Sequence, residues 1–274
     1  MQAESFSSWE DAVADLKRKS GSEELVRACF YDDPLLEAAE RYWQSSEWHS
    51  VRSYLSAAAG SALDIGAGRG ISAYALARDG WKVTALEPNP SNLVGAGAIR
   101  ALAVEACLSI EIVQNWGEKL PFENNVFDFV HCRQVLHHAR DLGQLCSQIG
   151  RVLKPGGMLI ATREHVISRK EDLASFLDTH PLHRYYGGEH AYLLREYTDA
   201  IERAGLKISD ILNPLETPIN FYPATREELK VRMASKLCLP FPRLIPDAAL
   251  TLAGRWINTP GRLFTFVARK PANE

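Results

Sequence analysis

The sequence has no long apolar run and no excess of charge of either sign. The longest stretch without Asp, Glu, Lys or Arg begins at Pro88, ends just before Arg100 and is interrupted by prolines and glycines, whereas a membrane-spanning helix needs ~20 mostly apolar residues. Lysine and arginine together number 31, aspartate and glutamate 34, and the formal net charge is −3. A chain without a broad basic field is poorly suited to binding a polyanion. We therefore expect no transmembrane segment and no nucleic-acid partner.

Cysteine is scarce, and its spacing excludes two kinds of small scaffold. The five cysteines are odd in number and form no C-x-x-C pair, which argues against a disulfide framework and against a zinc knuckle. Residues 1–17 carry acidic side chains and no apolar segment ahead of a cleavage site, so they do not resemble a secretory signal. Both observations predict a cytoplasmic protein.

The rest of the composition is that of a globular protein, with 46% hydrophobic and 24% charged residues in 274. Short, continuously apolar runs alternate with helical patterns from residue 61 onward, which is typical of a parallel sheet covered by helices on both faces. The runs that we expect to be strands are residues 61–65, 82–86, 108–113, 126–132 and 158–162. The expected helices between them are residues 72–78, 91–106 and 141–153. The sequence predicts a doubly wound, Rossmann-like α/β fold.

The pattern divides the chain into a core and three added segments. Residues 1–55 have helical spacing and predict an N-terminal helical cap. The core comprises residues 56–212 and 262–274, with a polar segment at 164–192 that we expect to be a substrate loop. Residues 213–261 form a proline-rich insertion before the last expected strand, with a basic amphipathic helix near 226–237. A basic face beside an apolar one predicts an acceptor-side lid and leaves peripheral membrane contact open.

A glycine-rich turn follows the first expected strand and points to a nucleotide-like ligand. Residues 62–70 read Ala-Leu-Asp-Ile-Gly-Ala-Gly-Arg-Gly, and glycines allow positive φ and close approach of a ligand to the backbone. Glu87 lies 21 positions after Gly66, where a carboxylate can accept hydrogen bonds from a ribose diol. Dinucleotide-binding domains use the same arrangement, but Ile71 stands where their G-x-G-x-x-G motif requires the third glycine.

Four motifs later in the chain distinguish a dinucleotide-binding domain from domains that bind another nucleotide-like ligand. They are residues 118–122 (Glu-Lys-Leu-Pro-Phe), 127–130 (Phe-Asp-Phe-Val), 136–138 (Leu-His-His) and 151–157 (Arg-Val-Leu-Lys-Pro-Gly-Gly). In this order and spacing the chain resembles the class I S-adenosylmethionine-dependent methyltransferases, the group that includes ubiquinone and small-molecule methyltransferases, over residues 55–163. The resemblance implies a seven-stranded sheet whose last strand is antiparallel, for which residues 262–269 are the candidate, and S-adenosylmethionine as cofactor.

The resemblance also implies a set of cofactor-binding residues. Asp64, Gly66, Ala67 and Gly68 would line the methionine and ribose parts, and Glu87 would hold the ribose hydroxyls. Pro88 would flank the adenosine.

Two further positions depart from the family's usual pattern. Residues 115–118 read Asn-Trp-Gly-Glu where relatives usually have Gly-Asp-Ala-Glu, so we expect Trp116 and Gly117, or Asn115, to contact the adenine. Arg133 follows the fourth expected strand, and we expect it to meet a carboxylate of the cofactor or the substrate.

Seven of the eight histidines fall between His131 and His190, around the expected mouth of the site. Methyl transfer to oxygen needs a base, and a neutral imidazole serves near pH 7. We predict His165 as this base, with Glu164 orienting it or replacing it, and His138 as the second candidate. His180-x-x-His183 has no cysteine or matched acidic pair beside it, so we expect structural histidines here and no metal site.

The segment around residues 185–192 combines glycines with polar aromatic side chains, as in a loop that closes over a hydroxylated ligand. The predicted substrate contacts are Arg163, His183, Tyr186, Glu189 and His190. We predict O-methylation of a sugar or saccharide-linked intermediate, with a polyketide, aromatic or quinone-type acceptor as the alternative. A non-catalytic binding module with this fold and a dinucleotide-dependent oxidoreductase are two further alternatives. The sequence carries no signal for the oligomeric state.

Overall fold

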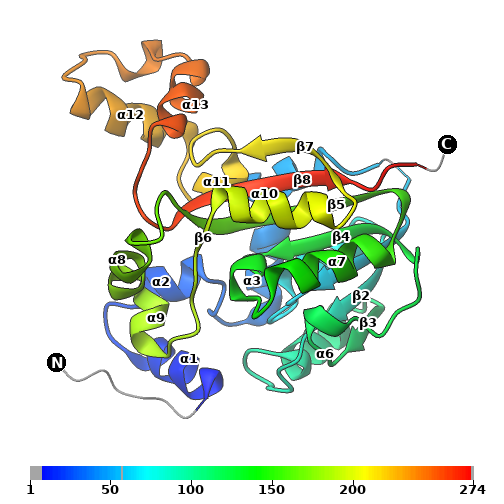
Figure 1. Ribbon diagram of the computed structural model, residues 1–274. Helices are drawn as coiled ribbons and strands as arrows, with labels where there is room; N and C mark the ends of the chain where they lie inside the picture. Colours follow the sequence, from blue (N-terminus) through cyan, green and yellow to red (C-terminus); the bar gives the residue numbers. More distant parts are fainter. Residues whose placement is uncertain (1–7, 57, 273–274) are drawn as a thin grey trace.

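The computed structural model describes residues 8–56 and 58–272 (Figure 1). Residues 1–7, which open the segment tested for a secretory signal, residue 57, and residues 273–274 at the end of the predicted core lie outside the described residues. The strands are β1 (Ser61–Ile65), β2 (Lys82–Leu86), β3 (Ile110–Val113), β4 (Phe127–Arg133), β5 (Leu153–Ile167), β6 (Tyr192–Leu193), β7 (Lys207–Leu212) and β8 (Arg262–Arg269).

The helices lie before, between and after these strands. Those ahead of β4 are α1 (Trp9–Arg18), α2 (Glu23–Ala28), α3 (Leu35–Trp43), α4 (Ser46–Arg52), α5 (Ile71–Arg78), α6 (Ala96–Glu105) and the 3₁₀ turn η1 (Gly117–Lys119). Those after β4 are η2 (Leu136–His138), α7 (Leu142–Val152), α8 (Asp172–Thr179), α9 (Pro181–Tyr185), α10 (Leu194–Arg203), α11 (Pro218–Phe221), α12 (Arg226–Lys236), η3 (Pro242–Leu244) and α13 (Asp247–Arg255).

The strands form one sheet in the order β3-β2-β1-β4-β5-β8-β7, and the two-residue β6 pairs with β5 beside this path. The strands from β1 to β5 run parallel to their neighbours, while β8 runs antiparallel to both β5 and β7. The predicted doubly wound α/β fold with an antiparallel last strand at 262–269 is therefore confirmed. The short β6 is an addition that the sequence pattern did not indicate.

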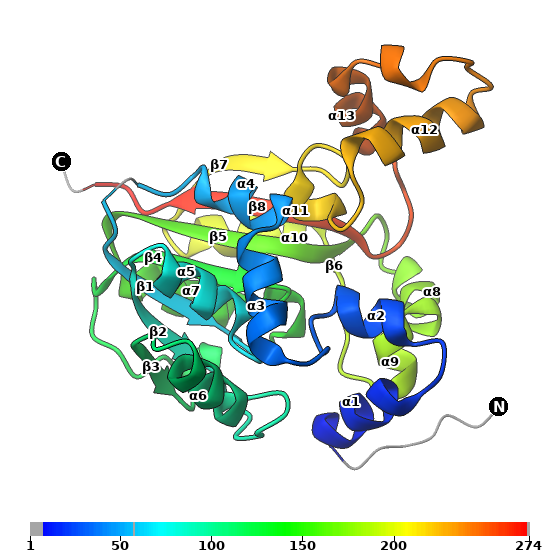
Figure 2. The same ribbon diagram turned by 180° about the vertical axis from the view of Figure 1, so that it is seen from behind.

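Apolar side chains cover both faces of the sheet, as the continuously apolar strands predict. One buried cluster joins β4, β5 and β8 to α7 and α10. The other joins β1 and β2 to α3, α4, α5 and α6, and the two views from opposite sides show these two helical layers (Figures 1 and 2). Among the described residues, no helix has the length and apolar character needed to span a membrane. The cytoplasmic location remains a prediction.

The predicted loop at 164–192 is largely regular structure. Strand β5 continues through residues 164–167, and α8 and α9 follow it. Phe176 and Ala191 are buried with Ile167 in a small apolar cluster, and Pro181 begins α9 with the His180 side chain as its N-cap. The segment is more regular than the sequence predicts, because a few apolar residues at helical spacing suffice to dock two short helices in a stretch dominated by polar residues. Its role in substrate contact remains a prediction.

The insertion at 213–261 consists of two parts with different surroundings. Its first part packs against the sheet: the Asn220 amide donates to the carbonyl oxygens of Leu212 and Asn213, and Thr265 donates to Asn220. Its second part, residues 226–255, carries α12 and α13 and projects from the rest of the molecule in both views (Figures 1 and 2). We call this second part the arm.

Candidate active site

A cavity of about 500 Å³ lies at the carboxyl ends of β1, β2, β4 and β5, the edge where doubly wound sheets place their ligands. Its volume is within the range of small-molecule sites. Eight of the predicted cofactor-binding residues line it: Gly66, Ala67, Gly68, Glu87, Pro88, Trp116, Gly117 and Arg133. Of the predicted catalytic and substrate residues, those that line it are His138, His165, Tyr186 and Glu189.

The glycine turn and Glu87 form one wall of the cavity. Gly68 has φ of 54°, and its N–H donates to Glu87 Oε2 over 2.8 Å. Glu87 Oε1 accepts from the N–H of Asn89 at 2.9 Å, and burial raises the pKa of the Glu87 carboxyl. A Cβ built on Gly68 would meet no atom within 4 Å, so the space above this residue is open. The turn therefore offers the bare backbone that a nucleotide-like ligand needs.

Asp64 does not line this cavity. Its carboxylate is buried, accepts a hydrogen bond from Ser72 Oγ at 2.7 Å and lies 3.0 Å from His131 Nδ1. Ser72 itself lines the cavity. Asp64 thus stabilises the glycine-rich turn from outside the cavity. Its direct contact with the cofactor remains a prediction.

The predicted adenine-reading positions lie at the outer rim. Trp116 lines the cavity with 57% of its surface exposed, and the Arg140 guanidinium lies 5.2 Å from the centre of its ring. A Cβ on Gly117 would come within 2.6 Å of Leu145 Cδ1, so only glycine fits there without movement of Leu145. Asn115 Oδ1 accepts from the N–H of Trp116. Adenine recognition by these residues remains a prediction.

Arg133 has a carboxylate partner, and that partner belongs to the chain itself. Glu47, fully buried on α4, accepts from Arg133 Nε at 2.7 Å and from Nη2 at 3.1 Å. The rings of Phe30 and Tyr42 lie against the guanidinium at 5.2 and 5.3 Å. Glu47 occupies the two-pronged position and the pair holds α4 against β4, while a contact of Arg133 with a ligand carboxylate remains a prediction.

Four histidines and one glutamate form the opposite wall, and we call them the histidine–glutamate cluster: His137, His138, His165, His180 and Glu189. Glu189 Oε2 lies 3.5 Å from His137 Nε2 and 3.8 Å from His138 Nε2, and Glu189 Oε1 lies 3.9 Å from His180 Nδ1. The His165 ring lies 4.7 Å from that of His137 and 5.1 Å from that of His180. The predicted base His165 thus belongs to a group.

The hydrogen-bond partners of Glu164 differ from those that the sequence predicts. It does not line the cavity but accepts from the backbone N–H groups of Val135, Leu136 and His137 at 3.0–3.1 Å. Its Oε2 also lies 2.6 Å from His137 Nδ1. Glu164 therefore orients His137 and not His165, whose Nδ1 instead faces the Gly261 carbonyl oxygen at 2.8 Å.

The charges around these histidines have opposite effects on their basicity. Burial lowers the pKa of His137, but the carboxylates of Glu164 and Glu189 outweigh this and raise it to about 9. Burial, followed by the nearby His137, lowers the pKa of His165 to about 3. Burial also lowers the pKa of His138.

Three predicted substrate residues lie away from the cavity: Arg163, His183 and His190. Arg163 Nη1 donates to the carbonyl oxygens of residues 219, 220 and 222, so it supports the base of the insertion. The His190 ring packs on Tyr192 at 4.4 Å. Their roles in substrate contact remain predictions.

The sequence reading missed the wall built by the N-terminal helices. Five residues of α1, α2 and the turn after α2 line the cavity: Trp9, Leu25, Cys29, Phe30 and Tyr31. Trp9 packs against Tyr31 and Tyr186, with ring centres 6.0 and 5.6 Å apart. An aromatic cluster so near the N-terminus was the available signal. No spacing rule links it to residues 150 positions later.

The similarity of this chain to known proteins is concentrated in the segment that contains the predicted cofactor-binding residues. Residues 63–161 match a family model described as a methyltransferase domain. The ubiquinone biosynthesis O-methyltransferase of Methylocella silvestris is 37% identical over 99 residues, which cover 36% of this chain and 38% of that protein. The protein of the same name from Methylobacterium nodulans is 30% identical over 163 residues, covering 58% and 64%.

The chain thus spans less than two thirds of the length of these two relatives. Among solved structures, geranyl diphosphate C-methyltransferase from Streptomyces coelicolor, in complex with S-adenosyl-L-homocysteine, has a TM-score of 0.60 at 16% identity, over 88% of this chain and 85% of that one. That likeness supports the fold. The matched family segment ends at residue 161, before His165 and Glu189.

Proposed function

We propose that this chain, whose residues 63–161 match the methyltransferase domain model, is an S-adenosylmethionine-dependent enzyme that methylates a hydroxyl oxygen of a small aromatic or quinone-type acceptor. The observation that carries the proposal is one continuous cavity, with the glycine turn at one end and the histidine–glutamate cluster with an aromatic wall at the other. Two substrates that must meet can lie side by side in such a cavity.

The cofactor end suits S-adenosylmethionine by shape and by hydrogen-bonding capacity. Gly68 leaves open space where a side chain would stand, and Glu87 is held by two backbone N–H groups with acceptor capacity left for a ribose diol. When bound, the cofactor supplies an electrophilic methyl group. The residues that would hold it are Gly66, Gly68, Glu87 and the Trp116–Gly117 rim.

The acceptor end favours an aromatic ring over a sugar. Trp9, Phe30, Tyr31 and the apolar Leu25 and Leu182 line this side, and a planar ring can stack there at low entropic cost. The names of two relatives, both ubiquinone biosynthesis O-methyltransferases, also favour a quinone-type acceptor. Both findings support the quinone-type alternative over the saccharide that the sequence analysis favoured.

The chain's own contribution is positioning and proton acceptance. The aromatic wall would hold the acceptor ring, and the hydroxyl would then face the histidine–glutamate cluster. Orientation supplies the larger part of the rate gain, and a positioned base adds ~10²-fold or more. Of the predicted bases, His165 and His138 line the cavity, while Glu164 is occupied by four donors.

The direct test pairs cofactor binding with an acceptor panel. We expect S-adenosylhomocysteine, and not NADH, to raise Tm, because only a bound ligand stabilises the folded state. Incubation with S-adenosylmethionine and 3,4-dihydroxybenzoate, with or without a prenyl chain, should give one O-methylated product by mass spectrometry. His165→Ala should lower kcat by ~10²-fold with the cofactor Kd nearly unchanged. Methylation of monosaccharides alone would reject the aromatic acceptor, and stabilisation by NADH alone would reject the reaction class.

A further inference from the structure

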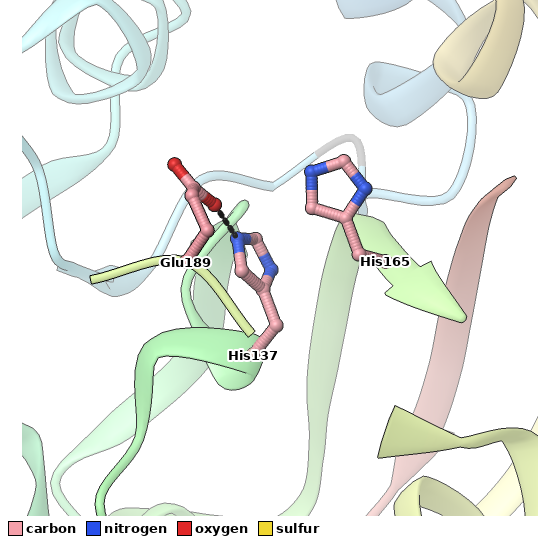
Figure 3. Close-up of side chains that lie close together, drawn as sticks. All are labelled: His137, His165 and Glu189. Atoms are coloured by element: carbon pink, nitrogen blue, oxygen red, sulfur yellow. Dashed lines mark ion pairs between the residues drawn. The ribbon is translucent and has the colours of Figure 1, made fainter. Parts of the chain in front are cut away.

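Three side chains of the histidine–glutamate cluster converge on one small space, as Figure 3 shows with His137, His165 and Glu189 together. Each offers one ligand atom, and these atoms all lie within 4.8 Å of one another. They come from η2, from β5 and from the segment before β6, so the fold assembles them from distant parts of the chain. We propose that His137, His165 and Glu189 bind a divalent transition-metal ion such as Zn²⁺.

The distances suit an ion after a small contraction. Nitrogen and carboxylate ligands lie about 2.0–2.2 Å from zinc, so two ligand atoms of one tetrahedral ion lie about 3.4 Å apart. His137 Nε2 and Glu189 Oε2, joined by the dashed line in Figure 3, are 3.5 Å apart. The three ligand atoms all lie within 4.8 Å of one another, so the widest gap closes with a side-chain movement of at most about 1.4 Å. Glu189 can supply that movement because it follows two glycines, Gly187 and Gly188.

The two imidazoles are held as metal-ligating histidines are. His165 Nδ1 faces a carbonyl oxygen, that of Gly261, which only accepts, so Nδ1 carries the proton and the Nε2 lone pair is free. His137 Nδ1 lies 2.6 Å from Glu164, which already accepts from three backbone N–H groups. A carboxylate or carbonyl behind the ligating imidazole fixes its tautomer and direction in metal sites.

The inward nitrogens are buried and poorly satisfied. Among the described residues, His165 Nε2 has no hydrogen-bond partner and His137 Nε2 has only the 3.5 Å ion-pair contact with Glu189, and the two residues are 7% and 1% exposed. An unsatisfied buried polar atom costs about 1–3 kcal/mol. His131 Nε2, His183 Nδ1 and His190 Nδ1 are also buried without a partner, so this observation supports the site only together with the convergence of the three side chains. A cation shared by both nitrogens and Glu189 satisfies all three groups at once.

The ligand set indicates the class of metal. Two imidazoles and one carboxylate suit Zn²⁺ and other first-row transition ions, whereas Mg²⁺ and Ca²⁺ prefer oxygen ligands throughout. Three protein ligands leave at least one coordination position free, as in catalytic zinc sites. All three residues line the cavity, so the free position faces the acceptor end.

The role of the ion rests on the proposed function, while its binding does not. His137, His165 and Glu189 would hold the ion beside the acceptor end of the cavity, and the ion would supply Lewis-acid assistance to deprotonation of an acceptor hydroxyl. His165, the base expected from the sequence, becomes a ligand in this scheme.

The test measures metal binding in the absence of either substrate. Chelator-treated full-length protein is titrated with Zn²⁺ by calorimetry and with Co²⁺ by visible absorption. We expect one equivalent bound at micromolar or tighter Kd, with the d–d bands of a four- or five-coordinate Co²⁺ ion. Glu189→Gln and His165→Ala should each raise Kd at least tenfold. His183→Ala is the matched control: it removes a histidine of the same region that does not line the cavity, and Kd should change less than twofold.

The outcomes separate the site from nonspecific binding and from the proposed function. A wild-type protein with no stoichiometric ion overturns the proposal, as does an equal Kd in all three variants. S-adenosylhomocysteine binding checks the fold of each variant, and if His165→Ala fails it, Glu189→Gln decides because Glu189 lies between secondary-structure elements. A bound ion without methylation of any aromatic acceptor would leave the metal site standing and reject the proposed function. If the protein binds no metal and methylation is unaffected by a chelator, the metal site is rejected and the proposed function stands.

Discussion

The two ends of the cavity are built in different ways. The cofactor end comes from consecutive strand-to-helix turns of one domain, with Gly66, Gly68 and Glu87 within 21 positions of one another. The acceptor end joins α1 and α2, η2, the end of β5 and the segment around Glu189, which span nearly 180 positions. One end depends on backbone shape and the other on side chains brought together by tertiary packing. Mutations should therefore separate the two ends, and the following predictions test that separation.

The largest expected effect is loss of cofactor binding in Gly68→Val. The residue has φ of 54° and open space above it, so a branched side chain fills the ligand's position and strains the backbone. We expect the Kd for S-adenosylhomocysteine to rise at least ~10³-fold, about 4 kcal/mol, while metal binding persists. Gly156→Val is the matched control, because Gly156 has φ of 79°, open space around its Cβ and no place in the cavity wall. Equal loss in both variants would attribute the effect to strain alone.

The second prediction concerns the ion pair that joins α4 to β4. Arg133→Met leaves the fully buried Glu47 without its two-pronged partner, and breaking a buried pair costs about 3–5 kcal/mol. We expect about 3 kcal/mol, the lower end, because Arg163 Nη1 remains 3.8 Å from Glu47 Oε2. Urea denaturation measures the free energy of unfolding.

Two further variants show whether the loss in Arg133→Met comes from the buried ion pair. The double variant Glu47→Gln with Arg133→Met should recover part of the loss, because it removes the unpaired carboxylate, while Arg163 loses Glu47 but keeps its hydrogen bonds to backbone carbonyl oxygens. Arg195→Met breaks the exposed pair with Asp199 and should cost under about 1 kcal/mol. A loss in Arg133→Met as small as in Arg195→Met would mean that the buried pair does not hold the N-terminal helices to the sheet.

The third prediction isolates the aromatic wall. Trp9→Ala removes the ring that packs on Tyr31 and Tyr186, and the loss of one stacking partner is worth about 1.4 kcal/mol, or tenfold. We expect KM for the aromatic acceptor to rise about tenfold, with the cofactor Kd unchanged in calorimetry. Trp256→Ala, at the residue directly after the arm, which is 79% exposed, is the control and should leave both constants unchanged. An equal rise in the cofactor Kd would contradict the separation of the two ends.

The smallest effect is expected from removal of the arm. The sequence analysis predicts an acceptor-side lid over 213–261, yet no described residue of this range lines the cavity. We expect replacement of residues 226–255 by a short glycine-containing linker to change the cofactor Kd and the KM for a water-soluble acceptor by less than about threefold. Residues 213–222 stay in place because they pack on the sheet. A strong rise in KM with unchanged cofactor Kd would restore the lid.

The same contrast explains what could be predicted from sequence. The strand pattern and the glycine turn depend on neighbours along the chain, so β1, β2 and β8 were located correctly and most of the predicted cofactor-binding residues line the cavity. Their contact with the cofactor remains a prediction. Glu47 and Trp9 depend on contacts with residues more than 80 positions away, and one sequence carries no register for such contacts. His165 was chosen because it directly follows a strand. Its partner His137 was missed, because Leu-His-His is read as a family motif and Glu164 was assigned to the wrong histidine.

The buried pair of Glu47 and Arg133 also determines when the chain can fold during its synthesis. The two residues are 86 positions apart, and a ribosome adds roughly 5–20 residues per second, so Glu47 leaves it roughly 4–17 s before Arg133. During this interval the carboxylate has no guanidinium to pair with, and Tyr42 and Trp48, both fully buried in the finished protein, have no sheet to cover them. The first helices of this protein therefore remain exposed to solvent until β4 has been synthesised. A ribosome that stalls between the two codons would leave an exposed aromatic surface for chaperones to bind.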